Sequence, residues 1–248
     1  SSDVCSSDLG CNSEACVIKV TPQPQGTSLK SLVNIYSLSA EHFEDQAIHL
    51  KKLFFKYKAR IMVIDANGIG GGLIDYMVKA QIDPETGDEL PPFGVEGGTY
   101  EEAVSDYKKY KTEDTVKDAM YLVKANAPIN TEAHAYVQTQ MSSGKIKFLI
   151  DEQTAKVKLT STKVGQNMTP DERNEYLMPF TQTSILKDQV CNLIEDNEGV
   201  NIILKQNNRS IPKDKFSAFE YALYYIKQDE QRRRRRKSHS IADLLFFN

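Results

Sequence analysis

The chain has 248 residues, and its 31 Lys and Arg residues against 34 Asp and Glu residues give a formal net charge of -3. Hydrophobic residues make up 40% and charged residues 26%, a balance typical of a soluble globular protein with one large domain or two small ones. No apolar run approaches the roughly 18 residues of a membrane span, and the four cysteines form no CxxC pair. These features argue against a membrane protein, a disulfide scaffold and a zinc site.

Residues 1–9 are expected to be foreign to the protein. Their sequence, SSDVCSSDL, looks like the in-frame translation of a common sequencing-library adapter, so it is set aside like an expression scar. The alternative is a genuine Ser-rich N-terminus. If the segment is foreign, the natural protein is expected to continue upstream of Gly10.

From residue 10 onward, β-rich segments alternate with amphipathic ones. Strands are expected over 15–20, 32–37, 60–64, 120–125, 146–150 and 200–205. Helices are expected over 43–58, 73–80, 130–141, 170–178, 183–196 and 212–228, and a turn-rich insertion over 83–92. The alternation predicts an α/β fold, with one domain over 10–229 and a basic C-terminal tail over 230–248 that contains the run at 232–237.

Asp65 is the first candidate site residue. It follows a short apolar strand and precedes Ala-Asn-Gly-Ile-Gly-Gly-Gly, and α/β proteins place ligand sites just outside strand ends. The glycines would let a phosphate or metal approach the backbone; the simpler alternative is a helix cap followed by a tight turn. The pattern matches neither a phosphate loop nor a dinucleotide-binding fingerprint.

Asp214 is the second candidate, in the first turn of the last predicted helix. The simpler interpretation is stabilisation of the helix dipole. Its surroundings are basic and suit a phosphate backbone. These cations are Lys205, Arg209, Lys213 and Lys215. Two carboxylates from different elements are among the parts that a divalent-metal phosphodiesterase needs.

Three segments carry a resemblance to a known family. They are AEHFEDQ at 40–46, VIDANGIG at 63–70 and IPKDKFSA at 211–218. In this order they resemble the C-terminal nuclease domain of the large terminase subunit of tailed bacteriophages, over 10 to about 228. The resemblance implies an RNase H-like fold, with a mixed central β-sheet flanked by helices. It also implies two Mg²⁺ or Mn²⁺ ions, with Asp65 as the fourth-strand ligand and Asp214 as the late-helix ligand.

The chain departs from this family in its metal ligands. Family members carry a first aspartate on strand one, before a turn that Gly10-Cys11-Asn12 resembles, so that strand is expected upstream of Gly10. Asp214 also stands alone where many relatives have a pair, and Asp188 and Glu220 are poor substitutes. We therefore expect an incomplete metal site and weak or absent activity until an upstream aspartate is restored.

The function implied by the resemblance is endonucleolytic cleavage of concatemeric double-stranded DNA during genome packaging, a hydrolase activity in the host cell cytoplasm. One ion would activate the attacking water and the other would stabilise the leaving oxygen. Implied partners are the portal protein and the small terminase subunit, and no membrane. The family's ATPase motor is missing from this sequence. Two alternatives stay open: another RNase H-like nuclease such as a junction resolvase, or a non-catalytic module that docks the motor to DNA and portal.

Overall fold

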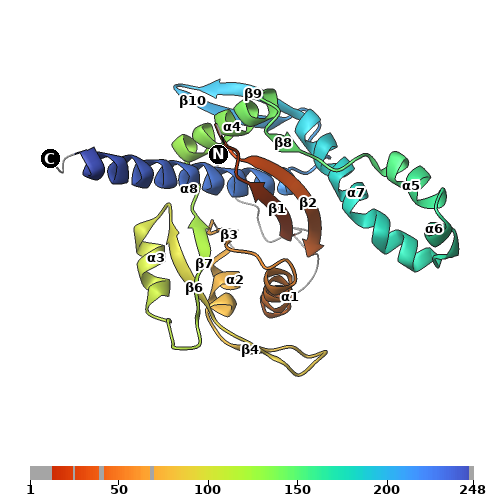
Figure 1. Ribbon diagram of the computed structural model, residues 1–248, viewed down its shortest axis with the longest axis horizontal. Helices are drawn as coiled ribbons and strands as arrows, with labels where there is room; N and C mark the ends of the chain where they lie inside the picture. Colours follow the sequence, from red (N-terminus) through yellow and green to blue (C-terminus); the bar gives the residue numbers. More distant parts are fainter. Residues whose placement is uncertain (1–12, 25, 39–41, 68–69, 246–248) are drawn as a thin grey trace. The chain divides into compact units, whose positions relative to one another are not determined.

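The computed structural model describes residues 13–24, 26–38, 42–67 and 70–245, with side chains described as far as Arg235. Residues 1–12, which include the segment expected to be foreign, lie outside the described part of the chain, as do residues 40–41 of the first family-like segment and 68–69 of the second. The chain divides into two compact units (Figure 1), each described by itself. The first unit contains Leu38–Ile129, and the second contains Glu14–Ser37 and Asn130–Asn248.

The first unit is built on a parallel sheet with the strand order β3-β7-β6. Its strands are β3 (Met62–Asp65), β6 (Phe93–Gly98) and β7 (Val116–Val123). Its helices are α1 (Phe43–Lys56), α2 (Gly70–Met77) and α3 (Glu101–Lys108), and β4 (Gln81–Ile82) pairs with β5 (Glu89–Leu90) in a short hairpin. The middle strand is buried along 119–123, as expected of a parallel strand covered on both faces.

Two neighbouring glycines on β6 give the first testable prediction. A Cβ atom at Gly98 would lie 2.5 Å from the carbonyl oxygen of Leu122, whereas at Gly97 the nearest atom would be 3.8 Å away. We expect Gly98→Ala to destabilise the protein by about 1–3 kcal/mol because backbone must move, and Gly97→Ala to have little effect. Urea unfolding of both variants measures the difference, and equal stability of the two would contradict this packing.

The second unit combines a small sheet, a hairpin and most of the helices. The sheet has the order β1-β2-β8, and its strands are β1 (Ser13–Thr21), β2 (Leu29–Leu38) and β8 (Ile146–Lys147). The hairpin pairs β9 (Leu193–Glu198) with β10 (Asn201–Gln206). The helices are α4 (Ala127–Ser142), α5 (Glu152–Thr160), α6 (Lys163–Asn167), α7 (Pro170–Cys191) and α8 (Asp214–Leu245).

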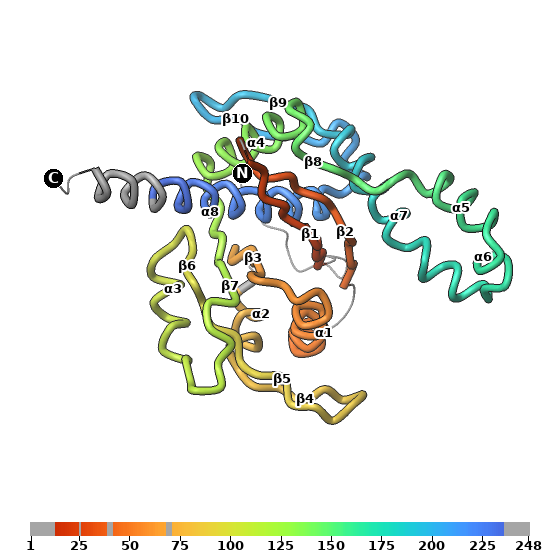
Figure 2. The backbone as a smooth tube through the Cα atoms, in the orientation of Figure 1, coloured from red at the N-terminus to blue at the C-terminus, as the bar shows by residue number. Residues whose placement is uncertain are grey.

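The apolar face of α8 organises the core of this unit. Phe219 and Leu223 are fully buried and cluster with Leu32 and Ile35 of β2 and Leu186 of α7. Figure 2 shows α8 running beside β1 and β2, while α5, α6 and the first half of α7 form an arm that extends away from them. The core therefore joins the N-terminal strands to the last helix.

The helix predictions over 170–178 and 183–196 were wrong in two respects. A single helix, α7, runs through Pro179. Proline has no backbone N–H, so the carbonyl oxygen of Glu175, four residues earlier, lacks its helical hydrogen bond. Glu175 is exposed. The chain after Cys191 then forms β9, because Gly199 adopts a positive φ of 63° and turns the strand back to pair with β10.

The last helix is longer than predicted. It continues through the basic run, where we expected a separate tail. Arginine is a good helix former, and Arg233 forms an i,i+4 ion pair with Asp229 at 2.9 Å. The α/β class itself is confirmed. Among the described residues, no helix combines the length and apolar character needed to cross a membrane.

Candidate functional site

Asp65 lies at the carboxyl end of β3, as the sequence predicted. Its strand pairs in parallel with β7, with Asp65 opposite Val123. The Asp65 side chain is exposed, and its Oδ1 accepts a hydrogen bond from the backbone N–H of Asn67 at 2.9 Å. Partial removal from water raises the pKa of this carboxyl above its usual value, and the Asn67 hydrogen bond opposes that shift. The result is a fixed carboxylate at a sheet edge where ligand sites form.

The glycines after Asp65 have a packing role that the sequence did not reveal. Gly70 to Gly72 form the first turn of α2, whereas the predicted helix began only at residue 73. A Cβ atom at Gly72 would lie 2.7 Å from the ring of Phe43 on α1. This glycine therefore allows α1 and α2 to pack closely.

Asp214 lies in the first turn of the last helix, as predicted, although α8 begins at Asp214 and not at residue 212; its side chain is exposed. Partial desolvation raises its carboxyl pKa, and the positive charges of Lys215 and Lys213 oppose the shift. Asp65 belongs to the first unit and Asp214 to the second. Among the described residues, no group of three or more His, Cys, Asp and Glu side chains could hold a metal ion.

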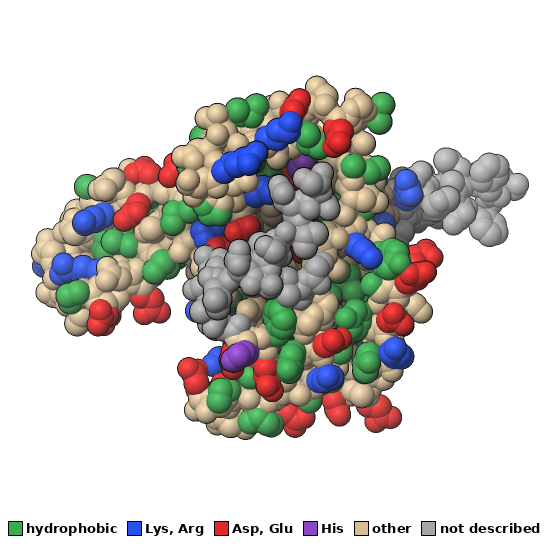
Figure 3. Space-filling view, turned by 180° about the vertical axis from the view of Figure 1, so that it is seen from behind, with side chains coloured by type: hydrophobic (Ala, Val, Ile, Leu, Met, Phe, Trp, Pro, Cys, Tyr) green, Lys and Arg blue, Asp and Glu red, His purple; other side chains and the backbone are tan. Residues whose placement is uncertain are grey.

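The four predicted DNA-binding cations do not form one free surface. Lys215 is buried, and its Nζ lies 2.6 Å from Glu14 Oε1 and 2.7 Å from Ser37 Oγ. Lys205 pairs with Asp196 at 2.5 Å, while Arg209 and Lys213 are exposed. On the face seen in Figure 3, cationic and anionic side chains are interspersed. Lys215 thus connects the start of α8 to β1 and β2 through its side chain. It is not part of an exposed basic surface.

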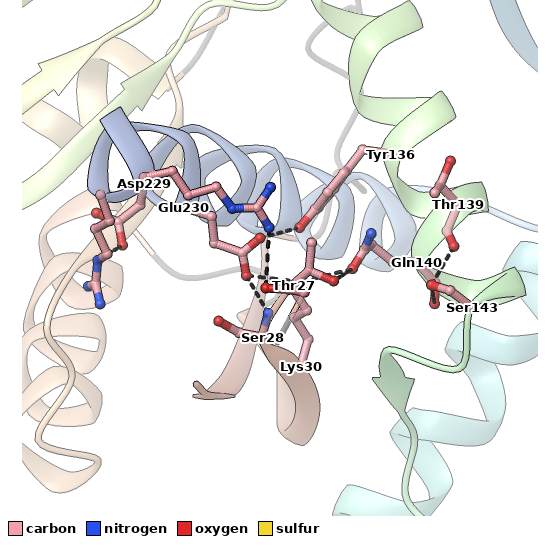
Figure 4. Close-up of polar contacts among 12 residues, drawn as sticks. Thr27, Ser28, Lys30, Tyr136, Thr139, Gln140, Ser143, Asp229 and Glu230 are labelled. Carbon is pink, nitrogen blue, oxygen red and sulfur yellow. Dashed lines mark hydrogen bonds and ion pairs between the residues drawn. The ribbon is translucent and has the colours of Figure 1, made fainter. Parts of the chain in front are cut away.

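A second buried lysine in this unit belongs to a polar network (Figure 4). Lys30 Nζ lies 2.8 Å from Gln140 Oε1 and 3.2 Å from Glu230 Oε1. Glu230 also accepts hydrogen bonds from the Ser28 backbone N–H at 2.8 Å and from the Tyr136 hydroxyl at 3.2 Å. This network ties the start of β2 and α4 to α8, which indicates a structural role.

His134 and Glu220 form a third buried polar pair. The ring nitrogen Nδ1 of His134 on α4 contacts Glu220 Oε1 on α8, and both side chains are largely buried. Burial raises the pKa of the Glu220 carboxyl, and His134 opposes that shift. Glu220 is therefore occupied inside the unit, consistent with its being a poor substitute for a metal ligand.

In the first unit, Lys51 is fully buried, and its Nζ donates to the carbonyl oxygen of Lys79, 2.5 Å away and two residues beyond the end of α2. Burial lowers its pKa to about 8, against 10.5 for a free lysine. Between these pH values the unfolded chain binds a proton that the folded chain does not, so stability should rise with pH in this window. We expect the Lys51→Met variant to lack the increase in unfolding free energy that Lys51 causes between these pH values.

Unfolding free energies of wild type and Lys51→Met, measured from pH 7 to pH 10.5, test this. The difference between the two proteins should change across the window. Parallel pH profiles would contradict a depressed lysine pKa.

No protein-family model matches the chain, and no curated protein and no solved structure gives a significant match.

Proposed function

We propose that this chain is the nuclease domain of a tailed-phage large terminase subunit and hydrolyses phosphodiester bonds of double-stranded DNA. The observation that carries the proposal is the exposed carboxylate of Asp65, fixed at the carboxyl end of a parallel strand. The ordered family-like segments around Asp65 and Asp214 support it. Genome packaging, the portal and small-subunit partners and the host cytoplasm follow as parts of the same proposal.

Asp65 and Asp214 would hold Mg²⁺ or Mn²⁺. Both are exposed carboxylates, and these hard cations take oxygen ligands, so the donor chemistry fits. When bound, the ions would supply activation of a water and stabilisation of the leaving oxygen. The third ligand in this proposal is an aspartate on a strand upstream of Gly10.

We also propose that the fold is RNase H-like, with a further strand that carries the lacking aspartate. In the described part of the chain, β1 and β3 are each the end strand of their own sheet. Each therefore has an edge at which a strand can pair. A strand upstream of Gly10 would bring its aspartate to the carboxyl end where Asp65 lies.

The competing function is a non-catalytic module that docks a packaging motor to DNA and portal. A junction resolvase is the other nuclease alternative, and an attached ATPase would exclude it.

Sequencing the template DNA upstream of the Gly10 codon tests the proposed function and separates it from a junction resolvase. We expect an open frame that encodes a strand with an aspartate and, before it, an ATPase with Walker motifs. If residues 1–9 prove to be genuine coding sequence with a start just upstream, the packaging nuclease is contradicted.

A further inference from the structure

The carboxyl edge of the sheet in the first unit brings together more than Asp65. In the parallel register, Asp65 on β3 lies opposite Val123 on β7, and Leu122 lies opposite Gly98 on β6. The residues that follow these pairs, Lys124 and Thr99–Tyr100, therefore leave the sheet at the same edge as Asp65. Three chain segments with chemically active side chains meet at one strand-end edge, the usual position of a ligand site in such sheets.

The backbone at this edge is fixed by Thr99. Its Oγ1 accepts a hydrogen bond from the Lys124 backbone N–H at 2.8 Å and donates one to the Lys124 carbonyl oxygen at 3.1 Å. The backbone N–H of Thr99 also donates to the carbonyl oxygen of Leu122 at 2.9 Å. The backbone N–H and the carbonyl oxygen of Lys124 are therefore both hydrogen-bonded to the Thr99 hydroxyl, whereas the Lys124 side chain is exposed.

The Lys124 side chain is held by an aromatic ring. Its Nζ lies 4.0 Å from the centre of the Tyr100 ring, the shortest cation–π distance among the described residues. The Tyr100 hydroxyl in turn donates to Glu102 Oε2, which orients the ring. Within the described part of the chain, Lys124 forms no ion pair. It is therefore an exposed, oriented cation whose charge is not neutralised by a carboxylate.

We propose that Lys124, oriented by the Tyr100 ring, binds the phosphodiester backbone of duplex DNA beside Asp65. This deepens the proposed function and rests on it. A polyanion that approaches Asp65 meets a negative carboxylate, and a fixed ammonium at the same edge offsets that repulsion. The contact neutralises one phosphate and releases its counterions. It positions the backbone without reading bases.

The test is duplex binding by the full 248-residue chain without divalent metal, where cleavage is not expected. A fluorescein-labelled 30-base-pair DNA is titrated by anisotropy at several NaCl concentrations. For Lys124→Met we expect binding about 5- to 10-fold weaker, and a slope of log K against log salt that is smaller by about 0.9, the value for one lost phosphate contact. Lys124→Arg should restore both, because it keeps the charge.

The matched control is Lys109→Met. Lys109 also lies over a tyrosine, Tyr110, at 5.5 Å, but at the far end of α3 from Tyr100 and paired with Asp106 at 3.7 Å. It should bind DNA like wild type. Unchanged thermal unfolding of each variant excludes misfolding as the cause.

Wild-type affinity and salt slope in Lys124→Met would overturn this inference, as would absence of duplex binding by the unchanged protein. Neither result depends on cleavage, which tests the proposed function separately. A protein that cleaves DNA with metal yet binds normally as Lys124→Met keeps the nuclease function and loses this phosphate contact.

Discussion

Replacing Asp65 with asparagine is expected to abolish metal-dependent DNA cleavage in protein whose upstream strand has been restored, with a loss of more than about 100-fold. Even the loss of groups that only support metal ligands costs about 10- to 100-fold, and a ligand itself should cost more. The fold should survive, because Asn Oδ1 can still accept the hydrogen bond from the Asn67 N–H. The Asp65 side chain is exposed, so the melting temperature should stay about the same.

The matched control for this substitution is Asp114→Asn, an exposed aspartate in the same unit. Cleavage by that variant should equal wild type. Plasmid nicking and thermal unfolding, measured on the same preparations, check both parts. Retained cleavage in Asp65→Asn would remove Asp65 from the metal site, and a marked fall in melting temperature would show that it acts through folding.

Replacing Glu230 with alanine is expected to destabilise the second unit by about 3–5 kcal/mol, the cost of leaving one partner of a buried ion pair alone. Lys30 is fully buried and keeps only the amide oxygen of Gln140 once the carboxylate is gone. The Ser28 N–H and the Tyr136 hydroxyl lose their acceptor as well. Urea unfolding at neutral pH measures the change.

Two further variants make that result specific. Glu175→Ala removes an exposed glutamate on α7 and should change stability by less than about 0.5 kcal/mol. The double variant Lys30→Met with Glu230→Leu should recover much of the loss, since apolar replacement of a buried pair is often neutral. A Glu230→Ala protein as stable as wild type would mean that the network is open to water.

The sequence was sufficient to predict those helices and strands whose apolar residues follow a regular pattern. The 3.6-residue recurrence of Phe43, Ala47, Leu50 and Phe54 placed α1, and a short apolar run placed β3 up to Asp65. Helix α5 was not predicted, although Asp151 accepts a capping hydrogen bond from the Thr154 N–H. Its apolar residues are few, so the periodic signal was weak. Strand β6 was also missed, because its three glycines suggest a turn.

The candidate site was predictable only in part, for a physical reason. Asp65 and Asp214 were found because a strand end and a helix start can be recognised locally. The burial of Lys215 was not, because its partner Glu14 lies 201 residues earlier in the chain. Lys124 could have been found by applying the same strand-end rule to the apolar run Tyr121-Leu122-Val123 that precedes it.

The most direct test of the nuclease account is cleavage of supercoiled plasmid by the protein extended with its natural upstream coding sequence. Nicked and linear products are measured in Mg²⁺ or Mn²⁺ and in EDTA, beside the 248-residue chain. We predict metal-dependent cleavage by the extended protein, weak or no cleavage by the shorter one, and none in EDTA. DNA binding without metal-dependent cleavage by the extended protein would contradict the account and favour the docking module.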